Sequence, residues 1–222
     1  MELLQCFKKS ALDVDLSSPW FWISVFSIAF NPFFWNVVAR REYKTKVITK
    51  FFKGNRYSGC YALAAVIQTL GAIRFLTFEK AMLHQPKAEC FQMLFTQVAA
   101  YVFFVVGFTL VMASFSPSES PGHSLVKTKT RSTPMRMLGD YFGILMDARV
   151  ISFPFNVNDD PMYNGTALMS LGTALWSSSP AGIYLSGFVH LVYRIALAFE
   201  GPFTSEIYRK RDESRKAGPR DS

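Results

Sequence analysis

Hydrophobic residues in this chain are gathered into four long windows that contain no Asp, Glu, Lys or Arg. The windows cover residues 16–39, 57–73, 90–118 and 161–193, which are 24, 17, 29 and 33 residues long. A bilayer-spanning helix needs about 20 predominantly apolar residues. A soluble helical bundle would keep a polar stripe along each helix, and these windows have none. The pattern therefore predicts an all-α integral membrane protein with four hydrophobic segments, built as a single domain over residues 1–222.

The first window, residues 16–39, does not resemble a cleavable signal peptide. It begins late, lacks a small-residue cleavage site and is rich in bulky aromatic residues. Asn31-Pro32 stands at its centre, and proline removes a backbone donor and disfavours helix in the residue before it. The window is either a kinked span or a re-entrant helix that dips into the membrane and returns. We favour the non-spanning form, and the Trp residues at both ends of the window suit an interfacial position.

The last window, residues 161–193, is too long for one helix across the bilayer. Its 33 residues would extend about 50 Å at about 1.5 Å per residue, against a hydrocarbon core of about 30 Å. Its middle reads Ser-Ser-Ser-Pro-Ala-Gly over residues 177–182, which breaks a helix. We therefore predict a broken helix or helical hairpin with arms over residues 166–176 and 181–199. The alternative is one long tilted helix preceded by a loop.

Basic residues distinguish these two topologies. Residues 40–56 carry seven Lys or Arg against one acid, residues 116–165 carry five, and residues 209–222 carry six, whereas the turn over residues 79–89 carries only two. Cytoplasmic loops are enriched in Lys and Arg, and only the hairpin puts all three basic segments on one side. Outside the windows we predict an N-terminal tail (1–15), a flexible loop (116–136) and a basic C-terminal tail (209–222).

Composition excludes several other kinds of protein. Half of the 222 residues are hydrophobic, 22 are Phe and only 18% are charged, so the chain is not intrinsically disordered. Cys6, Cys60 and Cys90 are too few and too widely spaced for a disulfide scaffold. The three histidines are scattered, which argues against a His/Cys metal cage. No metal is expected.

Polar strings are concentrated in the C-terminal half of the chain. They flank the predicted hairpin, which would return residues 160–165 and Glu200 to one face of the membrane, where they could share a pocket. The strings are GDYFGI (139–144), DARV (147–150), FPFN (153–156), DPMYNG (160–165) and EGPFTSEIY (200–208). With FNP (30–32) and WNVVAR (35–40), they resemble the phosphatidylethanolamine N-methyltransferase family, including its phospholipid methyltransferase branch.

The resemblance implies methyl transfer from the cofactor S-adenosylmethionine to the amine of an ethanolamine phospholipid, ending at phosphatidylcholine. One cofactor motif of this family is Gly-x-Gly on the third hydrophobic segment, which corresponds here to Val105, Val106 and Gly107. The other is a Glu-Glu pair after the last segment, which corresponds to Glu200 and Gly201. One member of each pair is replaced, so Gly107 and Glu200 are the residues we carry over. Taken alone, a glycine such as Gly107 is most often a helix-packing residue.

A second similarity extends the candidate cofactor site. Pro161, Tyr163 and Gly165 look like the Pro-x-Tyr-x-Gly string of the wider superfamily of integral-membrane methyltransferases that act on prenylated cysteine. A carboxylate such as Glu200 can bind the ammonium or ribose hydroxyls of the donor through charge-assisted hydrogen bonds. Tyr163 and Trp176 offer aromatic faces, which attract a quaternary ammonium product.

The lipid amine must lose a proton before it can attack a methyl group. A lipid ammonium has a pKa near that of lysine, about 10.4, and a low-dielectric pocket lowers it. Asp140, Tyr141 and Asp160 are the candidate catalytic residues that accept this proton. Arg149 is the candidate substrate-binding residue, because a planar guanidinium matches phosphate.

Two alternative functions stay open. One is a membrane methyltransferase of the same superfamily that acts on a prenyl-cysteine carboxylate, which needs no proton acceptor. The other is a non-enzymatic polytopic membrane protein such as a transporter, which would need polar residues along a path through the bilayer. The second and third windows hold only Gln68, Gln92 and Gln97 plus hydroxyls. The resemblance further implies a phospholipid substrate within the lipid bilayer, no nucleic-acid partner, and a multi-pass location in the endoplasmic reticulum membrane, a mitochondrial membrane or the contacts between them.

Overall fold

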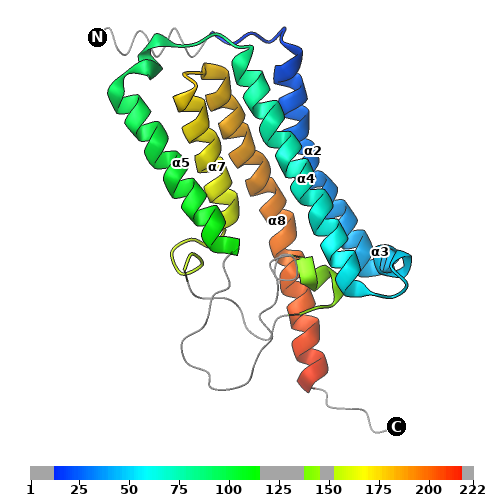
Figure 1. Ribbon diagram of the computed structural model, residues 1–222. Helices are drawn as coiled ribbons and strands as arrows, with labels where there is room; N and C mark the ends of the chain where they lie inside the picture. The colour runs from blue at the N-terminus through cyan, green and yellow to red at the C-terminus, as the bar shows by residue number, and fades with distance from the viewer. Residues whose placement is uncertain (1–12, 116–137, 146–152, 217–222) are drawn as a thin grey trace, which may run out of the picture.

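The computed structural model describes residues 13–115, 138–145 and 153–216, and every regular element in that part of the chain is a helix (Figure 1). The long helices are α2 (Pro19–Thr45), α4 (Arg56–Leu83), α5 (Leu94–Phe115), α7 (Pro161–Trp176) and α8 (Pro180–Lys216). The short ones are α3 (Val47–Phe51), η1 (Glu89–Gln92) and η2 (Gly139–Phe142). Helices α2, α4, α5 and α8 are long and apolar enough to cross a membrane. The predicted all-α membrane fold is confirmed.

The long helices alternate in direction, so the basic segments meet at one end of the bundle (Figure 1). Helix α2 ends beside α3 at the end where α4 begins, α5 returns to that end, and α8 runs back to it after α7 has left it. We call this the basic end, because it holds the Lys- and Arg-rich residues 40–56 and 209–216. The turn over residues 177–179 and η1 lie at the opposite end, which is the arrangement that the charge distribution favoured. The loop predicted over residues 116–136 lies outside the described residues.

Helix α2 is one unbroken helix of 27 residues, not the re-entrant segment that we favoured. Pro32 lies inside this helix and is buried. The side-chain amide of Asn36 donates to the carbonyl oxygen of Pro32 at 3.1 Å. Unwinding a helix in lipid would leave several backbone groups without partners, each costing several kcal/mol. The single donor lost at Pro32 costs less, so the helix continues through the proline.

The predicted hairpin is confirmed, and the single tilted helix is excluded. Helix α7 ends at Trp176 and α8 begins at Pro180. Ser178 adopts a positive φ of 52° in the turn, its carbonyl accepts from the Ala88 amide at 2.8 Å, and the Ser179 hydroxyl accepts from the Gly182 amide at 3.2 Å. The arms are longer than predicted, because α7 already begins at Pro161 and α8 continues to Lys216. The first part of the tail predicted over residues 209–222 is therefore helical.

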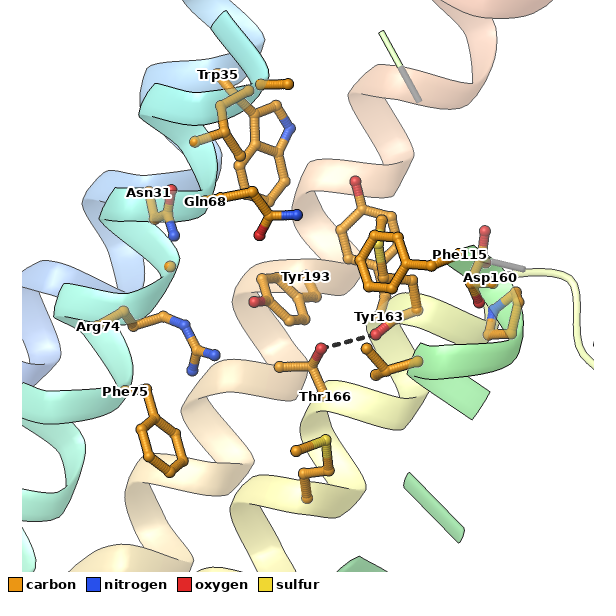
Figure 2. Close-up of a pocket in the computed structure, with 18 of the residues that line it drawn as sticks. Asn31, Trp35, Gln68, Arg74, Phe75, Phe115, Asp160, Tyr163, Thr166 and Tyr193 are labelled. Atoms are coloured by element: carbon orange, nitrogen blue, oxygen red, sulfur yellow. Dashed lines mark hydrogen bonds between the residues drawn. The ribbon is translucent and has the colours of Figure 1, made fainter. Parts of the chain in front are cut away.

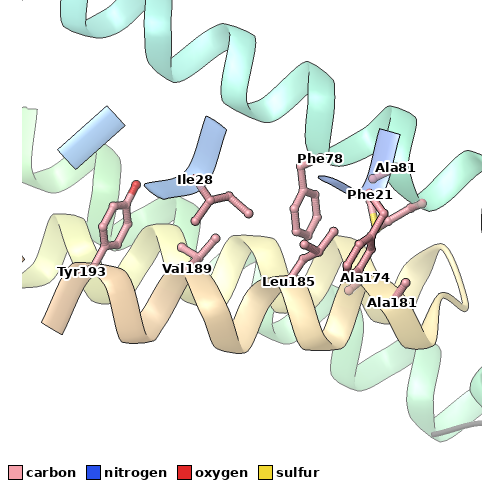
Figure 3. Close-up of a cluster of buried hydrophobic side chains, with 10 residues drawn as sticks. Phe21, Ile28, Phe78, Ala81, Ala174, Ala181, Leu185, Val189 and Tyr193 are labelled. Carbon is pink, nitrogen blue, oxygen red and sulfur yellow. The ribbon is translucent and has the colours of Figure 1, made fainter. Parts of the chain in front are cut away.

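Two kinds of packing hold the bundle together. Helices α2, α4 and α8 share a core of fully buried apolar side chains, among them Ile28, Phe78, Leu185 and Val189 (Figure 3). Helices α5 and α7 instead approach through glycines, and a Cβ added at Gly107 would lie 2.5 Å from the carbonyl oxygen of Gly165. Small residues that let backbones approach are the usual basis of helix association in lipid, where apolar burial adds little driving force.

Candidate functional site

A cavity of about 980 Å³ runs along the inside of the bundle (Figure 2). Its walls come from all five long helices and from the segment that precedes α7. Ligand sites in proteins usually measure about 300–1,000 Å³, so the cavity is large enough for two reactants together. Most of its wall is apolar, and its polar side chains include Asn31, Gln68, Arg74, Asp160 and Glu200.

The hairpin brings Tyr163 and Glu200 into direct contact in this cavity. The Tyr163 hydroxyl donates to Oε2 of Glu200 at 2.6 Å, although the two residues are 37 positions apart in the chain. Tyr163 lies two residues after the start of α7 at Pro161, and Glu200 lies twenty residues after the start of α8 at Pro180. Because α7 and α8 are antiparallel arms of one hairpin, both reach the basic end. The expected meeting of residues 160–165 with Glu200 is confirmed.

Helix α2 holds the Glu200 region in place from the other side. The Arg40 guanidinium donates to the carbonyl oxygen of Phe199, the residue before Glu200. The same guanidinium stacks on the Phe203 ring at 4.8 Å from its centroid. Contacts before and after Glu200 therefore fix this turn of α8 against α2, which positions the carboxylate.

Three aromatic rings line the cavity next to the Tyr163–Glu200 pair. The ring centroids of Tyr163 and Tyr193 lie 5.1 Å apart, and the Trp35 centroid lies 6.1 Å from Tyr163 and 6.3 Å from Tyr193. We call these three rings the aromatic triad. Trp176, the other aromatic residue named for the product, lies 64% exposed at the other end of α7. Trp35 and Tyr193 are the rings beside Tyr163, and only tertiary packing brings them together.

The three candidate proton acceptors occupy different places. Asp160 lines the cavity together with Pro161, which is buried as the first residue of α7. Asp140 faces a second, smaller hollow beside Lys210 and Arg211. The Tyr208 hydroxyl donates to Asp140 Oδ1 at 2.8 Å. Of the two carboxylates, only Asp160 is on the cavity wall.

Tyr141 is buried at the basic end and is held by the C-terminal half of α8. Its ring stacks on Phe203 with centroids 5.7 Å apart. Burial, followed by the negative charge of Glu200, raises the pKa of Tyr141 well above its ordinary value. Tyr141 is not among the residues that line the cavity.

The residues matched to the Gly-x-Gly motif do not line the cavity. Val105 and Val106 are exposed on the outer side of α5, and Gly107 packs its backbone against Gly165. Gly201 is exposed, with no atom within 4 Å of an added Cβ. Gly107 and Gly165 therefore position α7, and with it Tyr163. Arg149 lies outside the described residues.

Arg74 is the basic residue of the cavity that the sequence analysis missed. It follows the charge-free window of residues 57–73 and thus appeared only as the end of a hydrophobic segment. The signal was present, because the next four residues are again uncharged. In the structure Arg74 lies inside α4, not at its end, and points into the cavity (Figure 2).

Comparison with known proteins identifies the family of this chain. Residues 95–211 match the phospholipid methyltransferase family. The chain belongs to this family. It is 45% identical to phosphatidyl-N-methylethanolamine N-methyltransferase of Neurospora crassa, with 91% of this chain and 88% of the relative covered. The protein of the same name from Saccharomyces cerevisiae is 42% identical, with 91% and 92% covered.

Animal relatives are similar over the same length. Phosphatidylethanolamine N-methyltransferase of Rattus norvegicus is 42% identical, with 89% of this chain and 92% of the relative covered. No solved structure matches the chain. The match of the family to residues 95–211 covers η2, α7 and most of α5 and α8, and it includes Tyr163 and Glu200. Trp35 and Arg74 lie before it, on α2 and α4.

Proposed function

We propose that this protein transfers methyl groups from S-adenosylmethionine to the headgroup amine of phosphatidylethanolamine and of its monomethyl and dimethyl derivatives, producing phosphatidylcholine. The observation that carries the proposal is the 2.6 Å hydrogen bond between Tyr163 and Glu200 beside three aromatic rings. An acid and aromatic faces together suit cationic groups, and each reactant carries one: the donor its sulfonium and ammonium, the lipid its headgroup ammonium. The names of the fungal and animal relatives support the same reaction.

The residues on the cavity wall fit the donor. S-adenosylmethionine supplies a methyl group on a positively charged sulfur. Glu200, oriented by Tyr163 and by the contacts of Arg40, would bind the donor's ammonium or its ribose hydroxyls. The match of Val105–Gly107 to a cofactor motif stays a prediction of the family resemblance. In the structure, Gly107 supports the site by holding α7 against α5.

Asp160 is the proton acceptor that the geometry supports best. In the reaction a bond forms between the amine nitrogen and the methyl carbon, the sulfur–carbon bond breaks, and the nitrogen releases a proton. Asp160 faces the cavity in which the aromatic triad would hold the amine. Asp140 faces another hollow, and Tyr141 is not among the residues that line the cavity. Most of the rate increase comes from holding the two reactants in line, which can contribute about 7–11 kcal/mol.

The wall of the cavity disfavours the prenyl-cysteine alternative. A carboxylate acceptor would have to approach Glu200, Asp159 and Asp160, which all line the cavity. A substrate carboxylate within the cavity would be repelled by these carboxylates, because they carry the same negative charge. The aromatic triad would attract a methylated ammonium but offers nothing to a carboxylate.

We place the protein in the endoplasmic reticulum membrane, with the basic end in the cytoplasm. Positive loops favour that orientation. The turn over residues 79–89, at the opposite end, carries only two Lys or Arg, which supports this side assignment.

Label transfer tests the proposed function. Membranes from cells that express the protein would be supplied with methyl-labelled S-adenosylmethionine and, separately, with ethanolamine, monomethyl and dimethyl phospholipids. We expect label in the lipid fraction, and in phosphatidylcholine when the dimethyl lipid is supplied. Matched membranes without the protein are the control. Absence of label from all three lipids would refute the proposal.

A further inference from the structure

Arg74 is a buried cation in the membrane-embedded part of the bundle. Its residue surface is only 8% exposed. Its Nε has no hydrogen-bond partner among the residues that the structure describes. A buried nitrogen of a charged group without a hydrogen-bond partner costs free energy, and long basic side chains in membranes normally reach the interface instead. This side chain points into the cavity from α4 (Figure 2). Such an arrangement indicates an anionic ligand.

The depth of Arg74 in the membrane strengthens this indication. Helix α4 has 28 residues, or about 42 Å at about 1.5 Å per residue. Arg74 lies 18 residues after Arg56, about 27 Å along the helix. Wherever a hydrocarbon core of about 30 Å is placed along this helix, Arg74 lies within that core. Ionisable residues at such a depth usually serve function.

Charge is distributed unevenly along the cavity. Asp159, Asp160 and Glu200 line its wall where α7 begins, and Arg74 lines it on α4 opposite Thr166 and Tyr193 (Figure 2). The headgroup of an ethanolamine phospholipid carries the complementary pair of charges, a phosphodiester anion and an ammonium. With the phosphate at Arg74, the ammonium would point toward Tyr193 and the acids.

The cavity is open toward lipid between α4 and α5. Tyr61 and Phe75 of α4 and Met112 of α5 line it and are themselves exposed. Helices α4 and α5 stand on opposite sides of α7 and α8 (Figure 1). A phospholipid can therefore enter between α4 and α5 with its acyl chains still in the bilayer. A water-soluble donor would enter from the basic end, beside Glu200.

We propose that Arg74 binds the phosphodiester of the phospholipid substrate and thereby places its amine in the aromatic triad. The planar guanidinium suits this role, because it can donate two parallel hydrogen bonds to phosphate oxygens. The inference rests on the proposed function for the identity of the lipid. It assigns to α4 a recognition role that we had expected of Arg149.

The test compares Arg74→Ala and Arg74→Lys with a matched control, Arg194→Ala. Arg194 is also an arginine of a membrane-crossing helix, but it is exposed and lies outside the cavity wall. Two dissociation constants are measured for each variant in detergent micelles. One is for a fluorescent short-chain phosphatidylethanolamine, by anisotropy, and the other is for labelled S-adenosylmethionine, by equilibrium dialysis.

We expect lipid affinity to fall about tenfold or more in Arg74→Ala, as for the loss of a hydrogen bond to a charged group. Arg74→Lys should retain part of it, because lysine keeps the charge and loses the planar fork. Donor affinity should stay unchanged in both, and Arg194→Ala should match the wild type in both measurements. Unchanged lipid affinity in both Arg74 variants would overturn the proposal. A selective loss of donor affinity would overturn it too, and would assign Arg74 to the donor's carboxylate.

Binding and turnover measurements together distinguish a failure of the proposed function from a failure of the phosphate site. If the wild type binds lipid through Arg74 but transfers no label, the proposed function fails and the phosphate site stands. If the wild type methylates lipid and the Arg74 variants do so with unchanged KM for lipid, only the phosphate site fails. Arg74→Lys keeps the test decisive if Arg74→Ala does not fold, since it preserves charge and length.

Discussion

Replacing Glu200 by Gln is the most informative perturbation of the donor site. The amide keeps the size and shape of the side chain and can still accept from the Tyr163 hydroxyl, which now lies 2.6 Å from Oε2. It removes the negative charge that would meet the donor. Hydrogen bonds to charged groups contribute about 1.5–3 kcal/mol. The dissociation constant for S-adenosylmethionine should therefore rise about 10- to 150-fold.

Glu206→Gln is the matched control for this substitution. Glu206 lies on the same helix, six residues further on, where its carboxylate contacts Arg209 at 2.7 Å and Lys210 at 3.2 Å. These groups are exposed, and such surface pairs contribute about 0–1 kcal/mol. This variant should therefore bind the donor like the wild type. It removes one carboxylate from α8 without changing the cavity.

The assay is equilibrium dialysis with labelled S-adenosylmethionine, followed by steady-state kinetics with each substrate varied in turn. We expect Glu200→Gln to raise the KM for the donor more than the KM for lipid. The thermal midpoint should not fall, because a buried amide costs less than a buried carboxylate. An unchanged donor affinity together with a weakened lipid affinity would refute the reasoning and place the lipid amine at Glu200.

Three further predictions follow from the packing, the ionisation and the topology. Gly107→Val should cost about 1–3 kcal/mol of stability and so lower the thermal midpoint, because the added Cβ would lie 2.5 Å from the partner helix. The control Gly187→Val, which has open space around it, should leave the midpoint unchanged. A normal midpoint together with lost donor binding in Gly107→Val would make Gly107 a ligand contact. Because its pKa is raised by burial, Tyr141 stabilises the fold below the ordinary tyrosine pKa of about 10 and loses that contribution as pH rises beyond it. Tyr141→Phe should thus leave the pH profile of activity near neutrality unchanged, and a shifted alkaline limb would restore Tyr141 as the proton acceptor. The Lys53→Cys variant should react with an impermeant thiol reagent from the cytoplasmic side, and the Lys87→Cys variant only after permeabilisation. Equal labelling of the two variants would contradict the topology.

Sequence patterns predicted the parts of the fold that depend on length and charge. The Ser-Ser-Ser-Pro break at residues 177–180 and the positions of the Lys- and Arg-rich segments were sufficient for the hairpin. The prediction for α2 was wrong because it gave more weight to the helix-breaking preference of Pro32 than to the cost of unpaired backbone groups in lipid. Helix ends were less accurate: α7 begins at Pro161, the first-turn position that proline favours, and α8 continues through Gly201-Pro202 where a break was expected.

The site was only partly visible in the sequence. Tyr163 and Glu200 could be paired because a hairpin must return its ends to one side. Asp140 and Asp160 could not be ranked, because both adjoin aromatic strings and only packing separates their hollows. The aromatic triad needs three helices to meet, and no spacing in the chain encodes that meeting. Gly107 fits the ordinary role of a helix-packing glycine.

A structure of the protein in lipid nanodiscs, with S-adenosylhomocysteine and an ethanolamine phospholipid added, tests the central claim most directly. We predict that the nucleoside product lies in the cavity against Glu200 and Tyr163, with the lipid amine at the rings of Trp35 and Tyr193. Density for the nucleoside on the outer side of α5, at Val105 and Val106, would contradict the account.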